Sequence, residues 1–228
     1  SSSNADRTAF AATKMHNTLT RNSKDIASGF MNGKLLKMET INGTDVLVTE
    51  NQSYSDMTHR RAVFFVNKTF FVLVDEGYGD GTETFNANLN FNLCPAKDDV
   101  IIDEAHVDNH VYGAHTAFAD NNNMLFKTFV ETTAGYKVEN NTGYISEKLG
   151  EKTYQRRNYK VTIQKAVGKA ARSITITYPF GAPADFDKQA IEAQFTDNAE
   201  GEEGTFHAGG AAVKVTVNGK VYELSYTL

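Results

Sequence analysis

The sequence predicts an all-β fold, a large antiparallel β-sandwich with little helix. Short runs rich in β-branched and aromatic residues recur along most of the chain, which is typical of strands. The last sixteen residues alternate apolar and polar side chains on both sides of an Asn-Gly pair, which indicates a β-hairpin. Only one short segment has the pattern of a helix. The 228 residues are enough to bury a substantial core within one large domain.

The expected strands follow from these runs in chain order. Residues 60–76 form an internal hairpin, in which Val63–Val66 is one arm, Asn67-Lys68 is the turn and Thr69–Val74 is the other arm. Because both arms are almost continuously apolar, we expect strands that are covered on both faces, as in the middle of a sandwich. Further strands are expected within residues 46–54, 82–93, 123–133, 160–165 and 173–180.

The C-terminal hairpin has the clearest local signal. Asn218 and Gly219 both accept a positive φ, so a two-residue type I′ turn fits between its two strands. The first strand alternates, and its apolar positions are Val213, Val215 and Val217. Successive side chains of a strand point to opposite faces, so one face of this hairpin is expected to be buried.

The segments before this hairpin complete the domain organisation. Residues 185–195 are predicted to form a short helix, and residues 196–204 an acidic surface loop. We expect residues 1–182 to form the sandwich. Residues 183–228 are expected to be a hairpin subregion of the same domain or a small appendage.

The composition excludes several classes of function. The formal net charge of −5 argues against nucleic acid as a partner, because no global basic field exists to release counterions, although a local basic patch remains possible in such a chain. No run of about 18 apolar residues occurs, so no membrane span is expected. The single cysteine, Cys94, cannot form an internal disulfide, and its place at a strand end favours a small buried hydrophobic residue.

Common motifs for cofactors and nucleophiles are absent. The chain has no Walker loop, no GxGxxG, no paired CxxC, no HExxH and no GxSxG, and no cofactor is predicted. One acidic segment rich in histidine remains as a metal-binding alternative, which a metal-dependent hydrolase would use. Its six candidate ligands lie within fourteen residues: Asp103, Glu104, His106, Asp108, His110 and His115.

A second cluster of polar residues precedes the hairpin arm at 63–66. A guanidinium fork binds a carboxylate or sulfate through two hydrogen bonds, so this cluster is a candidate grip for an acidic group. The alternative is a solvated strand end. Alternation along the strand sends one of the two arginines to the opposite face from the other. The members of this cluster are Tyr54, His59, Arg60 and Arg61.

Four motifs in order resemble one known family. They are TKMHNTLT at 13–20, the long hairpin segment at 49–81, NNTGYISEKLGEKTYQRRNYKVTI at 140–163 and SITITYPF at 173–180. Together they resemble the β-sandwich part of the heparinase II/III-like polysaccharide lyases, most closely the heparinase III type. The resemblance covers residues 7–180 and implies the large layered sandwich of these lyases.

The resemblance implies a catalytic role for His16. Complete members have an N-terminal (α/α) toroid with a catalytic tyrosine and an asparagine that neutralises the uronate carboxylate, and a C-terminal sandwich that contributes a histidine. His16, in the HNT motif, matches that histidine. We therefore expect this chain to be the sandwich alone, without the toroid, and inactive or nearly so by itself. The implied partners are the toroid and an acidic polysaccharide, with heparan sulfate as the expected substrate.

The implied reaction is β-elimination at a uronic acid. The C5 proton is only weakly acidic, so a base must lie within reach and the neighbouring carboxylate must be neutralised. A histidine with an ordinary pKa of about 6.5 suits either role. Asn17 is grouped with the substrate-binding residues and, with Thr18, is expected to fix the backbone around His16. The expected substrate-binding residues are Asn17, Tyr54, His59, Arg60 and Arg61.

Two further implications concern metal and location. Some relatives hold a structural zinc with a second histidine two residues after the first, but here that position is Thr18. Asp45 and Asp75 are the carboxylates left for such a site, so no metal is assigned. The resemblance implies a secreted or periplasmic bacterial enzyme. The competing hypothesis is a sandwich without catalysis, which binds carbohydrate or serves as a scaffold.

Overall fold

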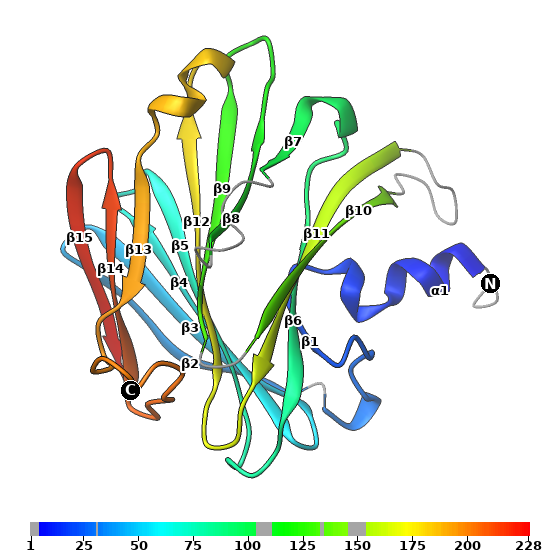
Figure 1. Cartoon of the computed structure of the whole chain (residues 1–228), viewed down its shortest axis with the longest axis vertical. Coiled ribbons are helices and arrows are strands. Elements are labelled where there is room, and N and C mark those ends of the chain that lie inside the picture. Colours follow the sequence, from blue (N-terminus) through cyan, green and yellow to red (C-terminus); the bar gives the residue numbers. More distant parts are fainter. Residues whose placement is uncertain (1–4, 31, 104–110, 133–134, 146–153) are drawn as a thin grey trace.

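Three antiparallel sheets make up the described part of the protein (Figure 1). The computed structural model describes residues 5–30, 32–103, 111–132, 135–145 and 154–228. Within these residues the helices are short, so the predicted all-β sandwich with little helix is confirmed. None of the described helices is long and apolar enough to cross a membrane.

The sheets differ in size and strand order. The four-stranded sheet has the order β1 (Leu19–Arg21), β6 (Phe85–Asn92), β11 (Tyr154–Lys165), β10 (Tyr136–Ile145). The eight-stranded sheet has the order β2 (Gly33–Ile41), β3 (Thr44–Tyr54), β4 (Met57–Val66), β5 (Phe70–Tyr78), β12 (Ala171–Phe180), β9 (Asn123–Glu131), β8 (Val111–Thr116), β7 (Val100–Asp103). The three-stranded sheet has the order β13 (Ile191–Phe195), β14 (Gly210–Val217), β15 (Lys220–Thr227). The helical segments are α1 (Ala5–Ala11), η1 (Thr13–Met15), η2 (Ser28–Phe30), η3 (Lys97–Asp99) and η5 (Pro183–Lys188).

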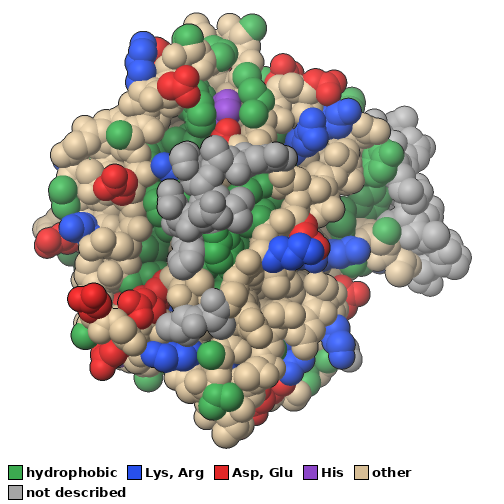
Figure 2. Space-filling view, viewed as in Figure 1, with side chains coloured by type: hydrophobic (Ala, Val, Ile, Leu, Met, Phe, Trp, Pro, Cys, Tyr) green, Lys and Arg blue, Asp and Glu red, His purple; other side chains and the backbone are tan. Residues whose placement is uncertain are grey.

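The eight-stranded sheet lies between the other two in Figure 1, with the three-stranded sheet on the left and the four-stranded sheet on the right. Strand alternation gives this sheet two apolar faces and therefore two cores. Phe64 and Val72 belong to the core shared with Val215 of the three-stranded sheet. Met57 belongs to the core shared with Leu89 of the four-stranded sheet. Hydrophobic side chains gather near the middle of the face shown in Figure 2, and charged side chains lie around them.

Both predicted hairpins are present. Asn67 and Lys68 lie between β4 and β5 and have φ values of 48° and 58°. Asn218 and Gly219 lie between β14 and β15 with φ values of 50° and 81°. Positive φ at both central residues is the requirement of a type I′ turn, which matches the twist of the strands on either side.

The expectation that β4 and β5 are covered on both faces holds only in part. Their second face carries a row of apolar residues that continues through β3 to the edge strand β2, in the register Leu73, Val63, Leu47 and Met38. The four-stranded sheet does not cover this row, and Met38 is 78% exposed. Phe65 and Phe71, next along the same face, stack on each other with ring centroids 4.4 Å apart. The apolar runs of β4 and β5 therefore include a second face that the described residues leave partly exposed, not one that is buried as the first face is.

The predicted helix at 185–195 is wrong. The 3-10 helix η5 ends at Lys188, and Ile191–Phe195 forms strand β13. Ile191 pairs with Val217 and is buried, whereas Glu192 is exposed, which is the period of a strand. Pairing with a strand more than twenty residues further along the chain overrides the weak local helix signal, and local propensity contains no information on such a partner.

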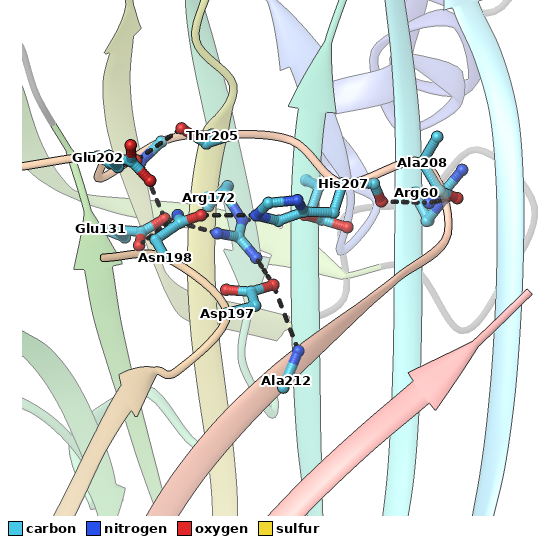
Figure 3. Close-up of polar contacts among 12 residues, drawn as sticks. Arg60, Glu131, Arg172, Asp197, Asn198, Glu202, Thr205, His207, Ala208 and Ala212 are labelled. Carbon is cyan, nitrogen blue, oxygen red and sulfur yellow. Dashed lines mark hydrogen bonds and ion pairs between the residues drawn. The ribbon is translucent and has the colours of Figure 1, made fainter. Parts of the chain in front are cut away.

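The predicted acidic loop at 196–204 follows β13, but it is more than a solvated turn. Its Asp197 receives a hydrogen bond of 2.6 Å from the Nη2 atom of Arg172, which is fully buried on β12. The same guanidinium donates to Glu76 at 2.9 Å and to Glu131 at 3.0 Å. Figure 3 shows this arginine reaching from the eight-stranded sheet to the loop. The buried Arg172 on β12 therefore connects β5, β9 and the 196–204 loop through one carboxylate on each.

The charge balance of this cluster depends on Arg172. The guanidinium carbon also lies 3.8 Å from the centroid of the Phe195 ring, so the cation is sandwiched between apolar and acidic groups. Burial raises the pKa of Glu76 to about 7, against the opposing charges of Arg172 and Arg60. Without the arginine, three carboxylates would remain close together with little water around them.

We expect the substitution Arg172→Met to lower the free energy of unfolding by about 3–5 kcal/mol, because removing one partner of a buried ion cluster leaves uncompensated charge. Urea unfolding of both proteins at neutral pH measures this difference. Arg7→Met, at an exposed position on α1, is the matched control and should change stability by less than about 0.5 kcal/mol. Equal effects of the two substitutions would show that the cluster does not stabilise the fold.

Candidate functional site

His16 lies on an exposed loop between η1 and β1. Its backbone is extended, with φ −113° and ψ 153°. Its amide nitrogen donates to the carbonyl of Thr13 at 3.1 Å, and its carbonyl accepts from the amide of Thr18 at 2.9 Å. The imidazole is therefore presented to solvent on a loop whose backbone is held on both sides of it.

Two asparagines of β6 hold this loop against the four-stranded sheet. The backbone amide of Asn92 donates to the side-chain oxygen of Asn17 at 2.7 Å, and the Asn92 side chain donates to the carbonyl of Lys14 at 3.2 Å. The backbone amide of Asn90 donates to the carbonyl of Thr18 at 3.0 Å. These contacts fix the chain immediately before and after His16. Asn17 thus fixes the backbone, as predicted.

An arginine of the neighbouring sheet supports the same loop. The Nη1 atom of Arg61 donates to the carbonyl of Asn17 at 2.6 Å. Its Nε and Nη2 atoms donate to the two carboxylate oxygens of Asp75 at 2.7 and 3.1 Å. The Asp75 side chain is 0% exposed, so a fully buried anion orients the arginine toward the loop. Such a bidentate pair fixes direction as well as distance.

His59 completes this buried group. Its Nε2 atom lies 2.6 Å from Asp75 Oδ1, and its Nδ1 atom lies 3.5 Å from the Thr18 hydroxyl. Burial lowers the pKa of His59, although Asp75 acts in the opposite direction. Burial alone would raise the pKa of Asp75, but the charge of Arg61 and the hydrogen bond from His59 lower it to about 2. At neutral pH the imidazole is therefore uncharged, and its Nε2–H group donates a hydrogen bond to the ionised aspartate.

The predicted grip of four side chains does not form one site. Arg60 points to the opposite face from Arg61, as alternation requires, and donates to Glu50 at 2.9 Å and to the carbonyl of Ala208 at 3.1 Å. Figure 3 shows its contacts with the loop that precedes β14. Tyr54 is buried, and its hydroxyl donates to the carbonyl of Lys24 at 2.6 Å. The structure brings His59 and Arg61 against the His16 loop and places the other two elsewhere. The alternative of a solvated strand end fails as well, because His59 and Arg60 are buried.

The possible metal ligands do not converge within the described residues. No group of three or more His, Cys, Asp or Glu side chains in this part of the chain could hold a metal ion. The oxygens of Asp75 are taken by Arg61 and His59, so the residues at this position do not fit a metal. Asp45 is half-buried, and its carboxylate accepts a hydrogen bond from the Thr40 hydroxyl at 2.6 Å.

The predicted histidine-rich cluster is described only at its two ends. His115 lies 3.1 Å from Asp103 and stacks on Phe186, with ring centroids 3.6 Å apart. Glu104, His106, Asp108 and His110 lie outside the described residues. Cys94 is partly buried and free.

Asn90 and Asn92 were missed from sequence. A signal for them exists, because β6 carries asparagine at every second position from Asn86 to Asn92. Asparagine is depleted in strands, so a regular row of it needs a reason other than strand formation. Here the reason at two of these positions is the support of the loop that carries His16.

The sequence of this chain matches one known domain family. The domain family described as "Heparinase II/III-like, C-terminal" matches residues 1–182. The chain belongs to the heparinase II/III-like family. The resemblance inferred from the four motifs is thereby confirmed.

Individual relatives agree with the family. A "Heparin-sulfate lyase" of Bacteroides thetaiotaomicron is 37% identical over 219 residues, which cover 96% of this chain and 28% of the relative. A "Heparin-sulfate lyase" of Bacteroides stercoris is 31% identical, with 95% of this chain and 29% of the relative covered. A solved structure called "Crystal Structure of Heparinase III" superimposes with a TM-score of 0.82 at 37% identity, over 97% of this chain and 31% of that one. The chain therefore spans less than a third of the length of these curated relatives.

The buried group behind the loop predicts a dependence of stability on pH. Because the pKa of His59 is lower in the folded protein than its ordinary value of about 6.5, the unfolded chain binds more protons below that pH. The contribution of His59 to the free energy of unfolding should therefore fall as the pH is lowered from about 7.5 to about 5, whereas Glu76, whose pKa is about 7 in the fold, shifts the free energy of unfolding in the opposite direction. Asp75 adds to this loss only below about pH 4, because its pKa is about 2 in the fold.

Urea unfolding of the wild type and of His59→Gln at both pH values measures this contribution. The variant lacks the titrating group, so lowering the pH over the same interval should change its free energy of unfolding less unfavourably than that of the wild type. The other titrating groups, Glu76 among them, are present in both proteins and cancel in the difference. An equal change in both proteins would show that His59 does not resist protonation in the fold.

Proposed function

We propose that this chain is the β-sandwich part of a polysaccharide lyase that cleaves a uronic-acid glycosaminoglycan, heparan sulfate, by β-elimination. The observation that carries the proposal is His16: an exposed imidazole on a loop held by strands β4 and β6, in a member of the heparinase II/III-like family. The names of the two Bacteroides relatives support the choice of substrate.

His16 is suited to one of two steps in this reaction. An uncharged imidazole accepts the C5 proton of the uronic acid, and an imidazolium neutralises the carboxylate as negative charge develops on it. Both roles need the ring at a fixed position relative to the sugar, because a small displacement of a catalytic group lowers the rate strongly. The contacts of Asn92 and Arg61 with the flanking residues supply that position.

The remaining catalytic groups belong to the proposed toroid domain. We propose that the described residues alone are inactive or nearly so, since the relatives are more than three times as long as the matched segment. The open apolar row on β2 to β5 offers a surface on which further protein can pack. Location in the periplasm or outside the cell is part of the proposal, because a long acidic polysaccharide is not expected to cross the cytoplasmic membrane.

A chimeric enzyme tests the role of His16. In it, this chain replaces the matching segment of the 37%-identical lyase of B. thetaiotaomicron, and the unsaturated uronate product of heparan sulfate is followed by its ultraviolet absorbance. We expect turnover by the chimera and a loss of about 10²–10⁴-fold in kcat for His16→Ala, the usual worth of a general acid or base.

His207→Ala is the matched control. This histidine lies on the loop before β14, where its Nε2 atom contacts Asn198 at 2.7 Å, and its removal should leave kcat unchanged. Unchanged kcat in His16→Ala, with the same thermal unfolding as the wild type, would contradict the proposed role of His16 and favour a scaffold. Clear elimination by the unfused chain would contradict the proposal that the other catalytic groups lie elsewhere.

A further inference from the structure

A polar groove adjoins the His16 loop on the outer face of the four-stranded sheet. Its volume is about 680 Å³, within the range of about 300–1,000 Å³ that is usual for small-ligand sites. Strands β6, β10 and β11 form its floor, and Lys14 and Met15 form one wall. These two residues directly precede His16, so whatever occupies the groove lies beside the proposed catalytic histidine.

A row of asparagines crosses the floor of this groove. Asn92 of β6 is in register with Asn158 of β11, which is in register with Asn141 of β10. All three face away from the core, because the alternate residues Phe91 and Tyr159 are buried in it. Three amides side by side on three strands are not needed for strand formation, which asparagine disfavours. Amides pair well with hydroxyl groups, since each offers donors and an acceptor.

The middle amide of the row faces the groove. Among the described residues we find no hydrogen-bond partner for the side chain of Asn158, and this residue lines the groove. Gly143, two residues along β10 from Asn141, leaves room for it: a Cβ atom at this glycine would lie 2.9 Å from Asn158 Nδ2. A side chain at position 143 would therefore displace the amide.

The groove also has a positive balance of charge among its described residues. Lys160 and Lys137 both pair with Glu139, and Lys14 is exposed at the rim. Hydrogen bonds from the two lysines lower the pKa of Glu139, so its carboxylate stays ionised and paired with them. Lys137 lies next to the groove and not in its lining, so the lining has the two ammonium groups of Lys14 and Lys160 against the one carboxylate of Glu139. This balance favours an anionic ligand, although the net charge of the whole chain is −5.

We propose that this groove is a binding subsite for acidic sugar units of the polysaccharide. The three asparagines bind sugar hydroxyl groups, and Lys14 and Lys160 bind a sulfate or carboxylate. The inference rests on the proposed function, because it places these sugars next to the bond that is cleaved at His16. It assigns recognition of the polysaccharide to the face of the four-stranded sheet rather than to the arginines of β4.

Direct binding tests the inference without turnover. The affinity of this chain for a heparan-sulfate tetrasaccharide is measured by calorimetry, for the wild type, Lys14→Met, Asn158→Leu and Gly143→Val. We expect each substitution to weaken binding by about tenfold, the effect of losing about one hydrogen bond to the ligand. Lys14→Met alters an exposed loop residue and serves as the variant least able to perturb the fold.

Two matched controls lie outside the groove. Asn86→Leu changes an exposed asparagine of the same strand β6, and Lys220→Met changes an exposed lysine of the three-stranded sheet. Neither should alter the affinity. Absence of binding by the wild type would overturn the inference, and so would groove variants that bind as the controls do.

A second readout separates this inference from the proposed function. In the chimera, the groove variants should raise KM and leave kcat nearly unchanged, whereas His16→Ala should lower kcat and leave tetrasaccharide binding by this chain unchanged. Specific binding in the groove by a chimera that lacks turnover would contradict the proposed function alone. Full turnover with unaltered KM in all groove variants would contradict the subsite alone.

Discussion

The pairing of Arg61 with Asp75 is the interaction on which the arrangement of the candidate site depends. The aspartate is buried without any exposed surface, and the arginine uses two of its nitrogens on it and a third on the carbonyl of Asn17. A buried anion cannot be left without a partner, so the guanidinium has little freedom to turn away. The loop of His16 is thereby attached to the eight-stranded sheet, while β6 attaches it to the four-stranded sheet.

The same two strands supply a second buried ion cluster on their other face. Arg60 and Glu76 are neighbours in register on β4 and β5, one residue away from Arg61 and Asp75. Alternation therefore turns two adjacent cross-strand pairs to opposite sides of one sheet. The pair Arg61–Asp75 supports the His16 loop. Glu76, of the other pair, accepts hydrogen bonds from Arg172 and from Tyr226 of the three-stranded sheet. Charged residues at adjacent register positions of β4 and β5 therefore hold both outer sheets to the central one.

Much of the fold followed from local patterns in the sequence. Asn67-Lys68 and Asn218-Gly219 specify their turns by backbone conformation alone. The catalytic role that the HNT motif predicts for His16 stays a prediction, and the structure adds that this residue is exposed. The errors concern features that depend on distant partners. The strand at Ile191 forms because Val217 pairs with it, and no local signal contains that pairing. Arg172 sits at the start of a strand, where an arginine would ordinarily be solvated, and its three carboxylates come from three distant segments.

The edge strand β2 has a consequence for how this chain behaves at high concentration. Its exposed Leu35 and Met38 lie on the outermost strand of the sheet, since among the residues that the structure describes no further strand pairs with β2. Natural edge strands are usually protected by charges, prolines or a covering segment, and an apolar edge recruits a second copy by strand addition. Lys34 and Lys37 supply some protection here. Samples of the separate chain will thus lose monomer to assembly through this edge unless a neighbouring domain shields it.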